Sequence, residues 1–137
     1  MFYLLDSENI SIKNFHDHFF SVDQKRYQSS KLIVFINREV AKNEKDCLIK
    51  MEACFNEIIV ESVDLEPTKN ALDFYLVSCL SLLSANHSGP FTVVSNDKGF
   101  CASLISLSRY LPKKTFNFLV PEFSHLYRWR DEWHCFE

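Results

Sequence analysis

Short, unbroken apolar runs alternate along this chain with longer segments of helical periodicity, and this alternation limits the folds that it can adopt. Each run stops abruptly at polar residues, and the three clearest are Phe2–Leu5, Leu32–Ile36 and Phe91–Val94. Unbroken apolar runs indicate strands that are buried on both faces, as in parallel sheets covered by helices. The pattern therefore predicts the α/β class, with a three-layer α/β/α architecture and a central, mostly parallel sheet of about five strands.

Further elements follow from periodicity and from turn residues. Two more apolar runs predict strands at Ile58–Val60 and Phe116–Val120. The helical spacing of apolar residues predicts helices over residues 9–20, 42–55, 69–84 and 99–111. Thr68, which follows Pro67, is the expected N-cap of the third helix, and Gly89-Pro90 is an expected turn. The tail from Pro121 is aromatic and charged, and we assign no element to it.

Length and composition limit the class of protein. The chain has 137 residues, of which 47% are hydrophobic and 13 are Phe, which predicts one domain over residues 1–137 with a Phe-rich core. Its five cysteines are odd in number and form no C-x-x-C pair, which predicts reduced thiols and a cytoplasmic location. No apolar run reaches the roughly 18 residues that a membrane span requires, so we expect no membrane contact.

The net charge restricts how the protein would meet nucleic acid. A formal charge of −3 is unlike that of proteins that bind duplexes by charge alone, which are normally basic. Contact with nucleic acid would then depend on a local basic patch, or on metal ions that reverse the sign of an acidic pocket.

Three aspartates are placed where such a pocket would form. Asp6 and Asp97 follow apolar strands, and ligands of parallel α/β sheets lie outside the carboxyl ends of the strands. Asp73 lies near the start of a long apolar helix, between Leu72 and Phe74. A charged residue is unexpected at such a position, which favours a functional role. Converging carboxylates repel each other unless a hard divalent cation such as Mg²⁺ or Mn²⁺ binds between them. The spacing therefore predicts metal-assisted phosphodiester hydrolysis, with these three acids as catalytic residues and metal ligands.

Other polar residues near these acids are weaker candidates for metal or substrate binding. Glu8 is a candidate fourth metal ligand, and Glu39 is a weaker one. Candidates for substrate binding lie beside the three aspartates: Asn9, Lys69, Asn96 and Lys98. Four of the acids also have a purely structural interpretation: Asp6 and Asp97 as turn residues, Asp73 as a solvent-facing charge, and Glu8 as a helix-dipole partner.

Three segments together resemble one family. Residues 2–10 (FYLLDSENI) resemble the "apolar strand, D-x-E-N-hydrophobic" opening of PIN-like and NYN-type domains. Residues 69–76 (KNALDFYL) are similar to their "K-x-A-L-D-hydrophobic-x-L" helix, and residues 93–100 (VVSNDKGF) to their "S-x-D-x-G-F" strand end. The matches occur in the expected order and frame residues 2 to about 105, whereas the region after about Leu119 has no counterpart.

The resemblance implies a metal-dependent ribonuclease in which Asp6, Asp73 and Asp97 hold Mg²⁺ or Mn²⁺ and the substrate is single-stranded or structured RNA. The chain departs from the family in one respect, because no single residue is clearly the fourth acid. Glu8 and Glu39 are both candidates for that position. The alternative is a catalytically weak RNA-binding or protein-interaction module on the same fold. A metal-dependent phosphatase ranks below both, because no Asp-x-Asp stands at a strand end.

Surface partners are expected at two kinds of segment. Basic residues that would contact RNA are Lys25-Arg26, Lys113-Lys114, Arg128 and Arg130, the last two among Tyr127 and Trp129. The aromatic C-terminal tail is the expected contact for a second copy of the chain or for a partner protein.

Overall fold

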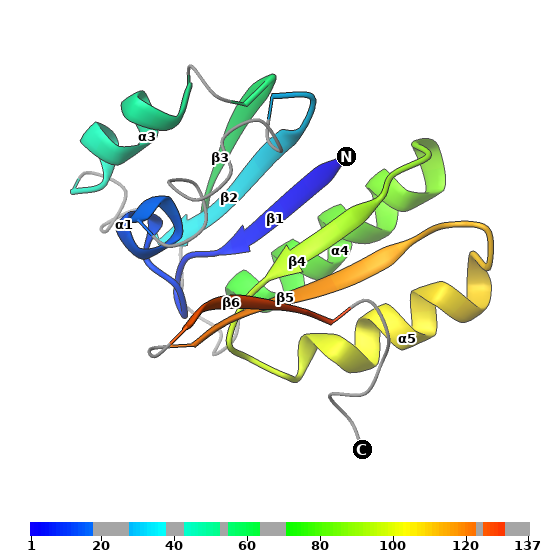
Figure 1. Cartoon of the computed structure of the whole chain (residues 1–137). Coiled ribbons are helices and arrows are strands. Elements are labelled where there is room, and N and C mark those ends of the chain that lie inside the picture. The colour runs from blue at the N-terminus through cyan, green and yellow to red at the C-terminus, as the bar shows by residue number, and fades with distance from the viewer. Residues whose placement is uncertain (18–27, 38–42, 53–54, 64–70, 123–124, 131–137) are drawn as a thin grey trace.

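The computed structural model describes residues 1–17, 28–37, 43–52, 55–63, 71–122 and 125–130, with backbone alone for residue 63 and beyond Leu119 (Figure 1). Six strands form one sheet in the order β3-β2-β1-β4-β5-β6. Their bounds are β1 Phe2–Asp6, β2 Lys31–Asn37, β3 Glu57–Val63, β4 Phe91–Val94, β5 Phe116–Glu122 and β6 His125–Arg130. The helices are α1 Ile12–Phe15, α3 Lys45–Glu52, α4 Ala71–Asn86 and α5 Phe100–Tyr110.

The first five strands are all parallel, and this confirms the predicted sheet. The sixth strand pairs antiparallel with β5 and was not predicted, since it lies in the tail to which the sequence assigned no element. The chain winds outward from β1 through β2 to β3, then crosses back to β4 on the other side of β1. The gap between the ends of β1 and β4 is therefore the switch point of the sheet, where α/β proteins bind ligands.

Helices cover the sheet on both faces, as the three-layer prediction requires (Figure 1). Side chains alternate along β1, so that Tyr3 and Leu5 face one layer while Leu4 faces the other. One core lies under α1 and α3 and includes Phe15 and Met51. The second core lies under α4 and α5 and contains buried residues of both helices: Leu72, Leu76, Leu80, Phe100, Cys101 and Leu104. Two packed cores thus hold β1 and β4 rigidly at the centre.

Several predicted limits differ from the structure. The helix predicted over 9–20 begins at Ile12, because Ser11 caps it by accepting the Asn14 N–H; residues 18–20 lie outside the described part. The helix predicted over 42–55 is confined to Lys45–Glu52 in the described residues. The third strand is longer than the predicted Ile58–Val60, because pairing with β2 continues through polar residues to Val63. The predicted helices 69–84 and 99–111 correspond to α4 and α5.

Other predictions fall partly outside the described residues. Pro67 and the expected cap Thr68 lie there, as do Cys54 and Cys135. The remaining cysteines, Cys47, Cys79 and Cys101, are free thiols. Among the described helices, none combines the length and the apolar character that crossing a bilayer demands.

Candidate active site

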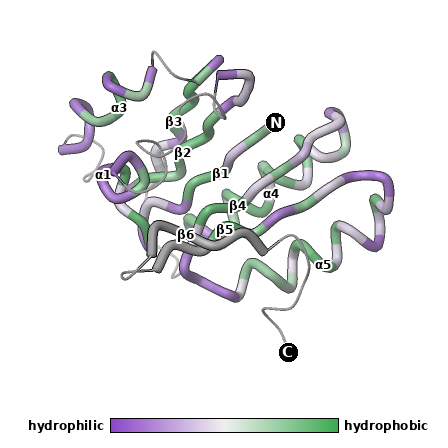
Figure 2. The backbone as a smooth tube through the Cα atoms, in the orientation of Figure 1, coloured by the Kyte–Doolittle hydropathy of each residue, from purple (hydrophilic) through white to green (hydrophobic). Residues whose placement is uncertain are grey.

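Hydrophilic segments follow the ends of β1 and β4, and Figure 2 shows them as purple stretches next to the greener strands. At the end of β1, Asp6 is completely buried. Its Oδ2 accepts hydrogen bonds from the Asn9 side-chain amide at 2.6 Å and the Ser95 hydroxyl at 2.7 Å, and its Oδ1 accepts a longer one from the Glu8 N–H at 3.3 Å. The backbone is held too, because the Asp6 carbonyl accepts the Ile10 N–H and Ser7 bonds to the Phe35 carbonyl of β2.

The end of β4 is tied to the same carboxylate through Ser95. While the Ser95 hydroxyl donates to Asp6, its oxygen accepts the backbone N–H of Asp97 at 2.9 Å. Asp97 Oδ1 in turn accepts the Gly99 N–H at 2.9 Å, at the start of α5. A Cβ at Gly99 would lie 3.0 Å from that oxygen, so the absence of a side chain there leaves room for the Asp97 carboxylate.

Asp73 reaches this site from the first turn of α4. One carboxylate oxygen of each of Asp6, Glu8 and Asp73 lies within 4.8 Å of the others. Oxygens that share one Mg²⁺ at about 2.1 Å lie no more than about 4.2 Å apart, so small side-chain rotations would bring these three to one ion. Asp97 is outside this trio, although its charge contributes to the potential at Asp73.

The surroundings of Asp73 disfavour its ionised form. Its Oδ1 is buried and has no hydrogen-bond partner among the described residues. Burial, followed by the negative charges of Asp6, Asp97 and Glu8, raises the pKa of Asp73 from 3.8 to about 6. The salt bridges found in the described part of the chain, Lys31–Glu57 and His16–Asp17, do not involve these acids. A divalent cation would satisfy the orphaned oxygen and lower the repulsion, so the residues fit such a group.

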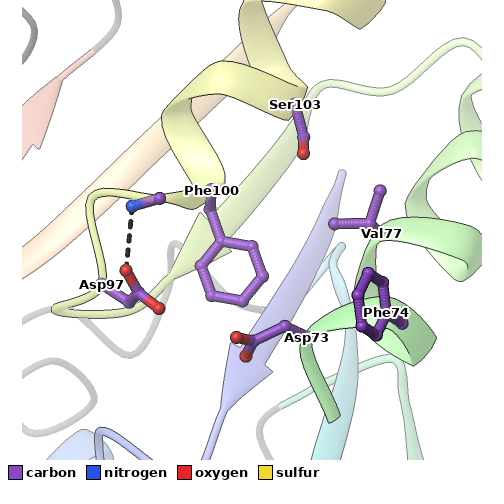
Figure 3. A pocket seen from close by; sticks show the side chains of 7 residues that line it. Asp73, Phe74, Val77, Asp97, Phe100 and Ser103 are labelled. Atoms are coloured by element: carbon purple, nitrogen blue, oxygen red, sulfur yellow. Dashed lines mark hydrogen bonds between the residues drawn. The ribbon is translucent and has the colours of Figure 1, made fainter. Parts of the chain in front are cut away.

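A pocket of about 290 Å³ adjoins the acids between α4 and α5 (Figure 3). Asp73 and Asp97 both line it, and in Figure 3 the Asp73 carboxylate points from α4 toward the loop that carries Asp97. The remaining lining residues are Phe74, Val77, Gly99, Phe100 and Ser103. The two aspartates that were predicted from separate motifs thus border one cavity.

The predicted secondary residues have varied positions. Asn9 donates its amide to Asp6, which makes it a residue that orients the carboxylate. Asn96 and Lys98 are exposed on either side of Asp97. Lys69 and Glu39 lie outside the described residues, as does Lys25-Arg26.

Sequence reasoning missed Ser95 as a site residue. This buried hydroxyl joins two of the predicted acids, one from each side of the switch point. The available signal was its position two residues before an Asp at a strand end, because such a Ser can accept the N–H of that Asp.

Fold and site together define a class: an α/β protein with carboxylates gathered at the switch point of a parallel sheet. A family profile described as PIN domain (PIN7) matches residues 1–111, and the chain belongs to the PIN domain family. This confirms the resemblance seen in the three sequence motifs. PIN domains form a superfamily of nuclease type, generally hydrolases of nucleic acid that use divalent metal ions. No curated protein and no solved structure matches the chain.

Proposed function

We propose that this protein is an endoribonuclease that hydrolyses phosphodiester bonds of RNA with the help of Mg²⁺ or Mn²⁺. The observation that carries the proposal is the buried Oδ1 of Asp73, which has no hydrogen-bond partner among the described residues, in a group where one oxygen each of Asp6, Glu8 and Asp73 lie within 4.8 Å of one another. Carboxylates this close repel one another when they are ionised, and bound positive charge lowers that repulsion. Membership of a nuclease-type family supports the same conclusion.

Asp6, Glu8 and Asp73 are the residues that would hold the ion, with Asp97 at the border of the adjacent pocket. A bound divalent cation would activate water and screen the charge of the phosphate. Mg²⁺ and Mn²⁺ are the candidate ions because Asp6, Glu8 and Asp73 all offer carboxylate oxygens, the hard ligands that these ions prefer.

The protein's own groups have separate tasks in this proposal. Asn9 and Ser95 hold the Asp6 carboxylate in one orientation, and the N–H of Gly99 holds that of Asp97. The Oδ2 of Asp97 is proposed to accept a hydrogen bond from water or a substrate hydroxyl. Lys98, exposed next to Asp97, is proposed to contact the RNA phosphate, with Asn96 as a polar neighbour.

A second function has one observation in its favour. Asp97 does not belong to the close trio of acids. A protein with this arrangement could serve as a weakly catalytic RNA-binding or protein-interaction module on the same fold. Cytoplasmic location, a partner at the aromatic tail and a single domain over residues 1–137 remain predictions.

The deciding experiment is cleavage of an unstructured RNA by purified protein with Mn²⁺ or Mg²⁺ and with EDTA. We expect cleavage that requires the metal, and Asp97→Asn should abolish it while the circular dichroism spectrum stays that of the wild type. Asp46→Asn is the matched control, because Asp46 lies on α3, against the opposite core. Binding of RNA without cleavage, across varied RNAs and divalent ions, would favour the second function instead.

A further inference from the structure

The pocket beside the acids has a chemistry of its own. Its walls are mainly apolar, with Val77 from α4 and Phe100 from α5, while the Ser103 hydroxyl supplies a polar group (Figure 3). Among the described residues that line it, the charged ones are Asp73 and Asp97 at its border. Its volume of about 290 Å³ is near the lower end of small-molecule pockets, so it suits one flat ring system.

Phe74 is unusual among the residues that line this pocket. On α4 its neighbours Leu72 and Leu76 are completely buried, whereas 67% of the Phe74 surface is exposed. Scattered exposed apolar residues are ordinary on protein surfaces. This one, however, follows Asp73 directly and borders the cavity. An aromatic ring with free surface at the edge of a pocket is a platform on which another ring can stack.

The charge distribution selects which part of a nucleic acid would enter. Asp73 and Asp97 repel phosphate, so the sugar–phosphate backbone would remain on the side where a cation binds. A nucleobase is uncharged and flat, with apolar faces and a polar edge. Its faces match Phe74, Val77 and Phe100, and its edge can bond to the hydroxyl of Ser103.

We infer that this pocket binds one unpaired nucleobase next to the phosphate that is cut, with Phe74 as the stacking residue. The inference rests on the proposed nuclease function for the position of that phosphate. A base stacked and paired within a duplex does not present its faces to Phe74, so the pocket restricts the substrate to single-stranded segments. Phe74 is accordingly a specificity-determining residue.

The test combines binding and cleavage. Binding of a short unstructured RNA that carries the fluorescent base 2-aminopurine is followed with Ca²⁺ present, and cleavage of the same RNA with Mn²⁺. Phe74→Ala should weaken binding and raise KM about 5- to 150-fold, the range that loss of one stacked base represents. Phe74→Trp should keep binding and KM close to the wild-type values, because an aromatic ring remains at this position. Tyr75→Ala is the control, since Tyr75 is also exposed but lines a different cavity with Cys79 and Leu82.

A second part of the test removes a nucleobase from the RNA instead of the aromatic ring from Phe74. A series of RNAs, each with one abasic nucleotide, should show one position next to the cut at which wild-type cleavage falls and Phe74→Ala has no further effect. Equal cleavage of all these RNAs, with Phe74→Ala behaving as wild type, overturns the base pocket and leaves the nuclease function standing. Quenching of 2-aminopurine that depends on Phe74, without any cleavage, overturns the nuclease and keeps the pocket. If neither quenching nor cleavage occurs, both are wrong.

Discussion

At the scale of single residues, the site depends on hydroxyl and amide groups as much as on its carboxylates. Asp6 is fully buried and accepts three hydrogen bonds, so its orientation is determined before any ion arrives. Asp73, in contrast, has a buried oxygen with no donor among the described residues. A preorganised ligand beside an unsatisfied one is the arrangement expected of a binding site.

Ser95→Ala tests this preorganisation. The change removes the donor to Asp6 Oδ2 and the acceptor of the Asp97 N–H. Because residues that orient metal ligands typically contribute about 10–100-fold in affinity or activity, we expect the Mn²⁺ concentration for half-maximal cleavage to rise by about that factor. Ser108→Ala is the control, since that hydroxyl donates only to the Ile105 carbonyl within α5. An unchanged metal requirement in Ser95→Ala would contradict the positioning role.

The raised pKa of Asp73, about 6 against 3.8, predicts a pH dependence of stability in metal-free protein. Between these values the folded state binds more protons than the unfolded state, so the free energy of unfolding falls as pH rises from about 4 to 6. Asp73→Asn should therefore be more stable than wild type at pH 7.5 in EDTA, by on the order of 1 kcal/mol after allowance for solvent screening.

Urea unfolding at several pH values measures this difference. The advantage of Asp73→Asn should vanish below pH 4, where both proteins carry a neutral side chain at this position. A difference of the same size at every pH would show that electrostatic repulsion is not its cause.

At the scale of elements, sequence patterns predicted which segments form strands and long helices, but not the residues at which these elements begin and end. Unbroken apolar runs identified β1, β2 and β4 because a strand covered on both faces admits few polar residues. The edge strand β3 was predicted too short, because Glu61 and Ser62 pair with β2 while their side chains are exposed. The first helix was placed too early, because residues 7–10 turn around the Asp6 carbonyl before Ser11 caps α1.

The turn before β4 provides a prediction at this scale. Gly89 has a φ of 78°, and a Cβ there would lie 2.5 Å from the Phe91 ring. Gly89→Ala should therefore lower the free energy of unfolding by about 1–3 kcal/mol, through backbone strain and displacement of the ring. Thermal or urea unfolding measures it, with Ser88→Ala as the control at the neighbouring exposed position. A loss below about 0.5 kcal/mol would contradict this account of the turn.

At the scale of the whole molecule, the acids join segments far apart in the chain. Asp6 and Glu8 belong to the end of β1 and Asp73 to α4, so an ion held by all three exists only in the folded state. Mn²⁺ should therefore stabilise the protein, by about 2.7 kcal/mol at 100 times its dissociation constant. The gain should be lost in Asp73→Asn and reversed by EDTA. Equal melting temperatures with and without Mn²⁺ would exclude the site.

Local sequence patterns were enough to predict the class of fold, three aspartates at strand ends and at a helix start, and the family. This was possible because local periodicity marks strands, and all parallel strands end at the same edge of a sheet. That β1 and β4 are neighbours became known from the folded chain alone, since strand order depends on packing between distant segments. That pairing brings Ser95 to Asp6, whereas the packing of α4 against β1 and α5 brings Asp73 to Glu8 and Phe74 to the border of the pocket. No local pattern encodes these relations. The same holds for β6, whose place beside β5 is set by a long-range ladder of backbone bonds.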